Sequence, residues 1–276
     1  MNLNTLLTEI GFNKLEADVY LYLLAHKPAT AYKIGKEINK PTANVYKAID
    51  SLKTKGAVLV ELNNNKLCSA ISPDEFLNHY EKNIFAKTQK LKTELKNLTP
   101  QTEDMLTYSI DSVSLVFERF ENMMNRCKSI AVVDAFPKAL EKVKPVIEKH
   151  ATRNIDIHIE SYEYIDIKNV DITEAMVGKQ ALEHWQSQQL NLVIDGKEYL
   201  LALFDNDLKK IIQATWSNNN YVACILHAGM LKEQTVLKIM KSVETNNSID
   251  KIKEILNAQK FFYNTEVPGA AKLINR

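Results

Sequence analysis

The segment from Thr30 to Ile71 constrains the fold of this chain more than any other, because it combines two short helical patterns with a tight connection between them. Thr30 is a favourable N-cap, and apolar residues recur at helical spacing from Ala31 onward. The connector Asn39-Lys40-Pro41 ends this helix, since proline cannot continue a helix and disfavours helical geometry in the residue before it. The first half of the segment therefore predicts a short helix followed by a sharp turn.

The second half of the segment predicts another helix and then a β-hairpin. Thr42 is expected to cap a helix over residues 43–55, and Gly56 ends it in the manner of a C-terminal glycine. Two runs of β-forming residues, 57–62 and 66–71, flank three consecutive asparagines that favour a turn. Two helices at a tight turn followed by a hairpin are typical of a winged helix-turn-helix, which binds double-stranded DNA.

The helix over residues 43–55 is the expected recognition helix, and Asn44 and Lys47 near its start are the expected base-reading residues. Tyr46 has an alternative role, because a tyrosine there can instead pack against the wing. Other polar residues of both helices and of the wing are expected to hold phosphates. The complete set of predicted DNA-binding residues is Thr30, Tyr32, Lys33, Thr42, Ala43, Asn44, Tyr46, Lys47, Lys53, Asn64 and Lys66.

Charge is distributed unevenly along the chain, although the net charge is only +1. Residues 1–72 carry nine lysines and six carboxylates, which gives +3, and residues 73–98 add five lysines and four carboxylates, which gives +1. The remaining residues, 99–276, therefore sum to −3. A basic front half and an acidic rear half favour a DNA-binding module joined to a domain with another role.

A long helix is predicted from Pro73 to Leu98, with apolar residues seven positions apart along one seam. About three heptads are enough for a short coiled coil, although Glu81 interrupts the seam. This helix is expected to join two copies of the chain into a homodimer, as a two-fold symmetric operator requires. The alternative is a linker helix that packs on its own C-terminal domain. The predicted dimerisation residues are Leu77, Ile84, Thr88, Leu91, Leu95 and Leu98.

The rear part of the chain alternates between strands and helices, which predicts an α/β domain and an α+β chain overall. We expect three parts: a winged helix-turn-helix over residues 1–72, a coiled-coil helix over 73–99 and an α/β effector or regulatory domain over 100–276. The expected strands are 130–134, 154–160, 190–194, 198–204 and 211–216, with a turn at Asp195-Gly196, and the expected helices are 137–150, 173–188, 221–241 and 249–262.

Signals for catalysis, cofactors or metals are weak in this rear domain. There is no phosphate-binding loop, no dinucleotide-binding glycine motif and no nucleophile elbow, so we expect no enzyme activity and no cofactor. Asp156, His158 and Glu160 share one strand face and could be read as metal ligands, but strand alternation alone explains them, and we expect no metal site. An effector pocket, if present, is expected at strand ends and the loops that follow them. The residues expected there are Asp134, Phe136, Glu160, Trp216 and Asn218.

Hydropathy, the N-terminal sequence and the cysteine pattern together lead us to expect a cytoplasmic protein. No stretch approaches about 18 uninterrupted apolar residues, so no membrane span is expected. The N-terminus lacks the basic and apolar regions of a secretion signal. The three cysteines, Cys68, Cys127 and Cys224, match neither a disulfide framework nor a zinc site.

Residues 11–56 resemble the TrmB family of transcriptional regulators. The resemblance lies in Glu16-Ala17-Asp18-Val19-Tyr20 with Leu23, where Asn13 and Glu16 also form a capping box, and in the run from Val45 to Leu52 with Gly56. It implies a winged helix, a dimerising linker helix and a C-terminal domain that senses an effector, in several relatives a sugar.

Residues 191–198 resemble the phospholipase-D-like domain of the same family. The catalytic H-x-K motif of such enzymes is missing, since none of the six histidines has a lysine two residues later.

These observations predict a dimeric, DNA-binding transcriptional regulator with a possible small-molecule effector. Two alternatives remain open at this level. The winged helix could dock another protein, in which case binding would lack the salt sensitivity of DNA affinity. The rear domain could instead be an enzyme under the control of the front domain, which a cleft with several perturbed titratable groups would favour.

Overall fold

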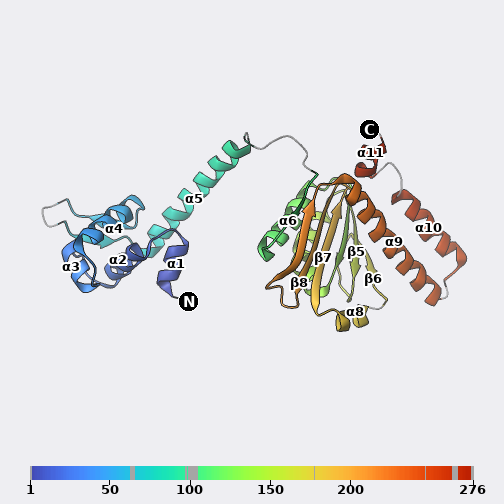
Figure 1. Ribbon diagram of the computed structural model, residues 1–276, viewed down its shortest axis with the longest axis horizontal. Coiled ribbons are helices and arrows are strands. Elements are labelled where there is room, and N and C mark those ends of the chain that lie inside the picture. Colours follow the sequence, from blue (N-terminus) through green and yellow to red (C-terminus); the bar gives the residue numbers. More distant parts are fainter. Residues whose placement is uncertain are drawn as a thin grey trace. The chain divides into compact units, whose positions relative to one another are not determined.

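The computed structural model describes residues 2–62, 66–96, 98, 105–176, 178–245, 247–262 and 267–274. For residues 96, 259–262 and 272–274 it describes the backbone only. The chain divides into two compact units, Met1–Gln101 and Thr102–Arg276 (Figure 1). Helices and strands are both abundant, and the strands belong mainly to the second unit. The mixed α+β fold class predicted from the sequence is thereby confirmed.

The first unit contains five helices and a small hairpin in its described part. In chain order they are α1 (Leu3–Glu9), α2 (Lys14–Ala25), α3 (Ala31–Glu37), α4 (Thr42–Thr54), β1 (Val58–Val60), β2 (Cys68–Ala70) and α5 (Pro73–Lys96). The strands β1 and β2 are antiparallel, with Val58 opposite Ala70, and an isolated bridge from Ala29 to Cys68 adds a third short segment. The expected asparagine turn, including Asn64, lies outside the described residues. This element order is that of a winged helix-turn-helix.

Local capping signals explain where these helices begin. The Asn13 side chain accepts a hydrogen bond from the Glu16 N–H while the Glu16 carboxylate accepts one from the Asn13 N–H, so the predicted capping box is present. Thr30 caps α3 as predicted. The predicted cap of α4 is wrong by one residue: Thr42 is the first residue of the helix, and the N-cap is Pro41, which makes no side-chain hydrogen bond.

The core of the first unit joins the buried faces of α2, α3 and α4 to the hairpin and to the start of α5. α4 buries Val45, Ala48, Ile49 and Leu52, which occupy one face at helical spacing. The Phe76 ring at the start of α5 is buried among aromatic rings of α2 and the preceding turn. These contacts leave the opposite face of α4 outside the core.

The second unit is built around one mixed seven-stranded sheet. Its elements are β3 (Thr107–Ser109), α6 (Val113–Arg126), β4 (Ile130–Ala135), α7 (Pro137–His150), β5 (Asp156–Ser161), β6 (Asp171–Glu174), α8 (Gly178–His184), β7 (Ser187–Ile194), β8 (Glu198–Asp205), β9 (Ile211–Ser217), α9 (Asn220–Glu244), α10 (Ile249–Phe262) and α11 (Pro268–Ile274). The strand order is β3-β9-β8-β7-β4-β5-β6. The strands β4, β5 and β6 are parallel to one another, and the remaining neighbours are antiparallel.

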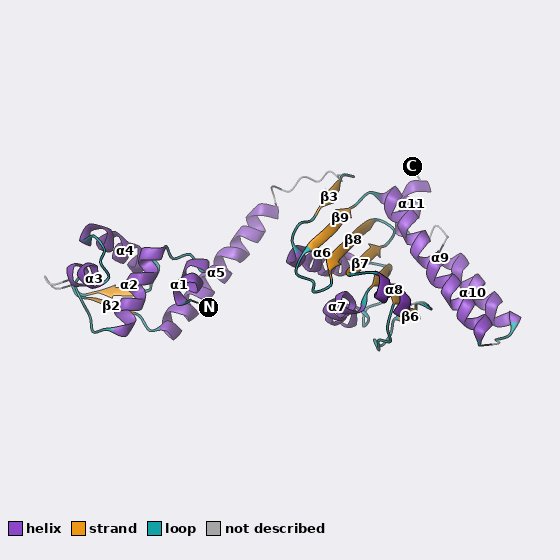
Figure 2. Ribbon diagram, turned by 60° about the horizontal axis from the view of Figure 1, so that its bottom comes forward, coloured by secondary structure: helices purple, strands orange, loops and turns teal. Residues whose placement is uncertain are grey.

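Helices cover both faces of this sheet (Figure 2). The main apolar core lies between one face and the helices α6 and α7, and it includes Phe120, Ile147, Ile159 and Leu192. The long helix α9 crosses the other face, with α10 alongside it (Figure 1). The apolar contacts beneath α9 form two small clusters, around Leu231 and Ala223. The face under α9 is therefore the one that has room for polar side chains.

Three sequence predictions in this unit need correction or addition. The helix expected over residues 173–188 is wrong: residues 171–174 form the edge strand β6, α8 covers only Gly178–His184, and β7 begins at Ser187. Strand β6 exists because it pairs with β5, a long-range contact that local periodicity does not report. The sequence prediction also missed β3 and α6, which lie between residues 107 and 126.

The Asp195-Gly196 pair forms the predicted turn between β7 and β8, with both residues at positive φ. The Asp195 carboxylate also organises the start of β4, because it accepts hydrogen bonds from the backbone N–H groups of Lys128, Ser129 and Ile130 at 2.8–3.1 Å. Asp195 is buried, so this residue has a structural role, in agreement with the interpretation from sequence.

Candidate nucleic-acid interface and effector site

The outward face of α4 is mainly polar and exposed, because its aliphatic residues Val45, Ala48, Ile49 and Leu52 are buried in the core. Asn44 and Lys47 are both exposed and lie three residues apart, so they project from the same side of the helix. Both belong to the first half of α4, the part of a recognition helix that reaches base edges. Tyr46 is half exposed, at 47%.

The structure places most of the predicted DNA-binding residues on the surface. Ten of the eleven lie in the described residues; Thr30 and Thr42 are partly buried and the others are exposed. Within the described part of the chain, the lysines among them form no ion pair, so their ammonium groups are available to phosphates. The exposed members are Tyr32, Lys33, Ala43, Asn44, Tyr46, Lys47, Lys53 and Lys66.

A partly buried ion pair that the sequence analysis did not identify joins Lys55, at the end of α4, to Glu16 of α2. The Lys55 Nζ lies 2.5 Å from Glu16 Oε2 and 2.7 Å from the Gly11 carbonyl oxygen. Burial alone would raise the pKa of Glu16, but hydrogen bonds from Lys55, Ser51 and the Asn13 backbone outweigh it and lower the pKa below 4.5. The sequence did carry a sign of this pair, since Glu16 is a carboxylate on an otherwise apolar face of α2. The ion pair holds the end of α4 beside α2.

The predicted coiled-coil seam lies exposed along α5 within the described chain. The relative exposure of Leu77, Ile84, Leu91 and Leu95 is between 43% and 57%, and Leu98, which follows the helix, reaches 75%. Thr88 is exposed as well. A row of exposed large apolar side chains along one helix face is typical of a surface that a partner covers.

Asp134 and Glu160, two of the five predicted effector residues, lie side by side. They occupy paired register positions on the parallel strands β4 and β5. Phe136 follows β4 and its ring packs edge-on against Tyr162, with 4.5 Å between ring centroids. These three residues therefore belong to one region, at the carboxyl ends of β4 and β5.

Trp216 and Asn218 do not belong to that region, so their assignment to the same pocket is wrong. Trp216 is on β9, three strands away from β4, and its register partner Leu200 faces the α6 and α7 core. The Trp216 indole N–H donates to Glu198 at 2.6 Å, and the ring lies under the Arg119 guanidinium. Asn218 follows the same strand. Their separation from Asp134 depends on strand order, which the sequence alone did not provide.

Three polar residues near Asp134 were missed by the sequence analysis. The Gln189 Nε2 donates to both carboxylate oxygens of Asp134 at 2.8 and 2.9 Å, and the Asn191 Nδ2 donates at 2.9 Å. The Tyr162 hydroxyl is hydrogen-bonded to the same group. Asn191 alternates with apolar residues in the predicted strand 190–194, which was the available sign that it faces away from the core, whereas Gln189 lay outside that predicted strand.

The strand face that carries Asp156, His158 and Glu160 does not form a metal centre in the described residues, where no group of three or more metal-binding side chains comes together. His158 instead bonds Asp171 through Nδ1 at 2.9 Å, and Asp171 also accepts from Lys238 at 2.5 Å. The hydrogen bond from His158, with that from Lys238, lowers the pKa of Asp171 to about 2 although burial opposes it. These contacts tie β6 to α9.

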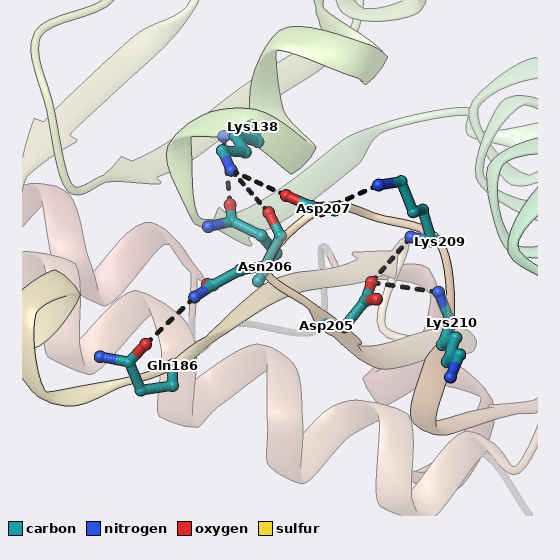
Figure 3. Close-up of polar contacts among 8 residues, drawn as sticks. Lys138, Gln186, Asp205, Asn206, Asp207, Lys209 and Lys210 are labelled. Carbon is teal, nitrogen blue, oxygen red and sulfur yellow. Dashed lines mark hydrogen bonds and ion pairs between the residues drawn. The ribbon is translucent and has the colours of Figure 1, made fainter.

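A second cluster of charged residues lies at the β8–β9 turn, where lysines and aspartates pair with one another (Figure 3). The Lys138 Nζ from the first turn of α7 donates to the Asn206 carbonyl at 2.7 Å and lies 3.8 Å from Asp207. Asp207 also pairs with Lys209 at 3.0 Å, and Asp205 accepts from the Lys209 N–H. Opposite charges balance here, so the cluster fastens the turn to α7.

The fold of the first unit and its exposed recognition helix define the winged-helix class of DNA-binding domains. Residues 6–74 match the model of the TrmB family, described as the sugar-specific transcriptional regulator TrmB. The N-terminal domain is thus similar to the TrmB family, in the region where the motifs around Glu16 and Tyr46 carry the predicted resemblance.

Two curated relatives extend this likeness over about half of the chain. The uncharacterized protein YrhO of Bacillus subtilis (strain 168) is 26% identical over 146 residues, which cover 53% of this chain and 45% of that protein. The HTH-type sugar sensing transcriptional regulator TrmBL1 of Pyrococcus furiosus is 23% identical over 146 residues, covering 52% of this chain and 43% of TrmBL1. The matched region is therefore less than half the length of either relative. Both the matched family model and TrmBL1 are named as transcriptional regulators.

Among solved structures, TrmBL2, an archaeal chromatin protein with a novel mode of DNA binding, aligns with a TM-score of 0.40 at 15% identity, covering 84% of this chain and 96% of TrmBL2. NucT from Helicobacter pylori aligns with a TM-score of 0.34 at 11% identity, covering 50% of this chain and 96% of NucT. Among the described residues, no helix has the length and apolar character needed to span a membrane.

Proposed function

We propose that this chain is a sequence-specific, DNA-binding transcriptional regulator that works as a homodimer under the control of a ligand. The observation that carries the proposal is the exposed polar face of α4, with Asn44 and Lys47 at its start, in a domain that matches a family of transcriptional regulators. Asn44 is suited to pair with adenine and Lys47 with the acceptors of guanine. The surrounding lysines and hydroxyl groups hold the phosphates.

Dimerisation through α5 supports this function. We assign residues 1–72 to DNA binding, 73–99 to pairing of two chains and 100–276 to effector sensing. Two recognition helices held at a set spacing match the two half-sites of a symmetric operator. A ligand that binds the second unit in only one arrangement of the dimer shifts the population between DNA-competent and DNA-incompetent forms. The exposed seam of α5 supports pairing.

The DNA-binding function is tested by fluorescence anisotropy on the DNA upstream of this protein's own gene, across a salt series and against a random duplex. We expect selective binding whose affinity falls steeply with salt. Asn44→Ala removes a base contact and is expected to weaken operator binding by about 1–3 kcal/mol, roughly 5- to 150-fold, with little effect on the random duplex. Lys47→Glu is expected to weaken both.

The matched control is Lys142→Glu, which makes the same charge reversal on an exposed position of α7 in the second unit. It is expected to leave DNA affinity unchanged. Equal affinity for the upstream DNA and for random duplex would move the test to a genome-wide selection of operator fragments. Failure to select any sequence there, with Lys47→Glu indistinguishable from Lys142→Glu, would refute DNA recognition by α4 and favour docking of a protein.

A further inference from the structure

A row of four polar side chains crosses the face of the sheet beneath α9. Asn191 on β7 is the register partner of Asp134 on β4, Asp134 is the partner of Glu160 on β5, and Glu160 is the partner of Thr173 on β6. Neighbouring strands lie about 4.8 Å apart, so the four side chains leave the same face at that interval. We refer to Asn191, Asp134, Glu160 and Thr173 as the Asp134 row.

The Asp134 row places two carboxyl groups side by side in a buried place. Glu160 is 3% exposed, and the charged groups that act on it are two further carboxylates, Asp134 and Glu233 of α9. Burial, and then these neighbours, raise the pKa of Glu160 to about 8, and burial likewise raises the pKa of Asp134. No ion pair joins a lysine or arginine to Asp134 or Glu160 in the part of the chain that the structure describes. The acids of the row therefore have no basic partner in the described residues, and Glu160 keeps its proton up to about pH 8.

Hydrogen-bonding capacity is also left unused at this row, which is an observation independent of charge. Thr173, the fourth member, is 5% exposed, and its Oγ1 has no hydrogen-bond partner. Gln234, on the buried face of the covering helix α9, is 1% exposed, and neither of its amide atoms has a hydrogen-bond partner. Buried polar atoms without partners are uncommon in native proteins, and a ligand or ordered water is the usual reason for them. The row thus offers an unpaired hydroxyl group beside two buried carboxyl groups.

The surroundings of the row favour an organic cation. The described residues do not group metal-binding side chains in a way that could hold a metal ion. The rings of Tyr162 and Phe136 pack together just beyond the row, where their faces can attract an ammonium or guanidinium group. Tyr162, which bonds Asp134, also lines a cavity of about 500 Å³ between the end of β5, the end of β6 and α8.

We propose that the Asp134 row binds an organic cation that carries a primary ammonium or guanidinium group, and that this cation is the effector of the regulator. The N–H groups of such a cation donate to the carboxylates of Asp134 and Glu160 and to Thr173 Oγ1, and its charge removes the repulsion between the two acids. The binding part of the proposal stands on the second unit alone. Its regulatory part rests on the proposed DNA-binding function.

The first experiment is calorimetric titration of the full chain with putrescine and with L-arginine, using glucose and magnesium chloride as comparison ligands. We expect one of the two cations to bind, and Asp134→Asn and Glu160→Gln each to weaken binding at least about tenfold. The control variant is Asp156→Asn, which removes an exposed carboxylate from the start of the same strand β5. It is expected to leave the affinity unchanged. Tryptophan fluorescence verifies that each variant is folded.

Proton release gives a readout that a merely structural row would not produce. The groups that face Glu160 are Asp134 from β4, Tyr162 from the end of β5 and Glu233 from α9, and a bound cation favours the ionised form of all of them. Binding is therefore expected to release protons, so that affinity rises with pH and the measured enthalpy depends on the buffer. A cation that binds without either effect would contradict placement at this row.

The outcomes separate the site from its regulatory role. Binding that Asp134→Asn and Glu160→Gln abolish, with DNA affinity changed by the same cation, supports both parts. The same binding without any change in DNA affinity, or in a chain that does not bind DNA, keeps the site and refutes the effector role. No cation binding below roughly 10 mM, binding of glucose or Mg²⁺ in its place, or equal loss in Asp156→Asn would overturn the site.

Discussion

The pH dependence of stability is the most direct consequence of burying Glu160 beside Asp134. The pKa of Glu160 is about 8 in the folded chain, against an ordinary value of 4.5. Between these values the folded state keeps a proton that the unfolded state has lost, so the stability contribution is complete at low pH and declines as the pH rises through this window. Replacement of Glu160 by glutamine removes the ionisable group and therefore this decline.

The magnitude follows from the separation of the two pKa values. One pKa unit corresponds to about 1.4 kcal/mol, so an isolated group of this kind costs roughly 4 kcal/mol near pH 8 and roughly 1.4 kcal/mol near pH 5.5. Asp134 lies beside Glu160, and burial raises the pKa of its carboxyl group as well. The titrations of the two acids are therefore coupled, and the loss of stability is spread over both groups. We therefore expect Glu160→Gln to gain about 1–3 kcal/mol relative to the wild type when the pH is raised between these two values.

The assay is urea denaturation followed by tryptophan fluorescence. Both tryptophans, Trp185 and Trp216, belong to the second unit, so the signal reports that unit and is silent on the winged helix. The exposed carboxylate of Asp156 supplies the control, since Asp156→Asn removes a charge from the same strand without burial. Parallel stability profiles of wild type and Glu160→Gln across this pH range would refute the argument, because they would mean that Glu160 titrates normally.

Two further predictions concern pairing and the β7–β8 turn. Replacing Ile84 and Leu91 together by lysine places charges in the exposed seam of α5, and we expect sedimentation equilibrium to show a monomer in place of a dimer. The control Lys90→Ala, which lies off the seam, is expected to stay dimeric. An unchanged mass for the double variant would refute pairing through α5. Asp195→Asn is compatible with the positive φ of the turn, but it leaves one of the three backbone N–H groups without its carboxylate oxygen. We expect urea denaturation to show that the second unit is destabilised by about 2–4 kcal/mol. A change under about 0.5 kcal/mol would show that the turn, and not the carboxylate, holds β4.

Sequence patterns predicted the features that depend on neighbouring residues. The capping box of Asn13 and Glu16, the hairpin turn at Asp195-Gly196 and the helix bounds Pro137–His150 and Ile249–Phe262 all agree with the structure. Each of these is set by hydrogen bonds or backbone conformations within a few residues of the chain. Helix α6 carried the same type of signal, an N-capping Ser112 followed by apolar residues at helical spacing, and the sequence analysis left it unread.

Tertiary structure alone decided the features that depend on strand order and register. Residues 171–174 form a strand because β5 supplies the partner, and nothing local distinguishes them from the start of a helix. Asp134, Glu160, Thr173 and Asn191 are up to 57 residues apart in the chain and form one row because four strands align them on the same face. Trp216 was separated from them for the converse reason, since it lies on another strand and the opposite face. The sequence by itself therefore determined the winged helix and the buried and exposed faces of α4, through local capping and periodicity, whereas only long-range pairing brought the buried acids together.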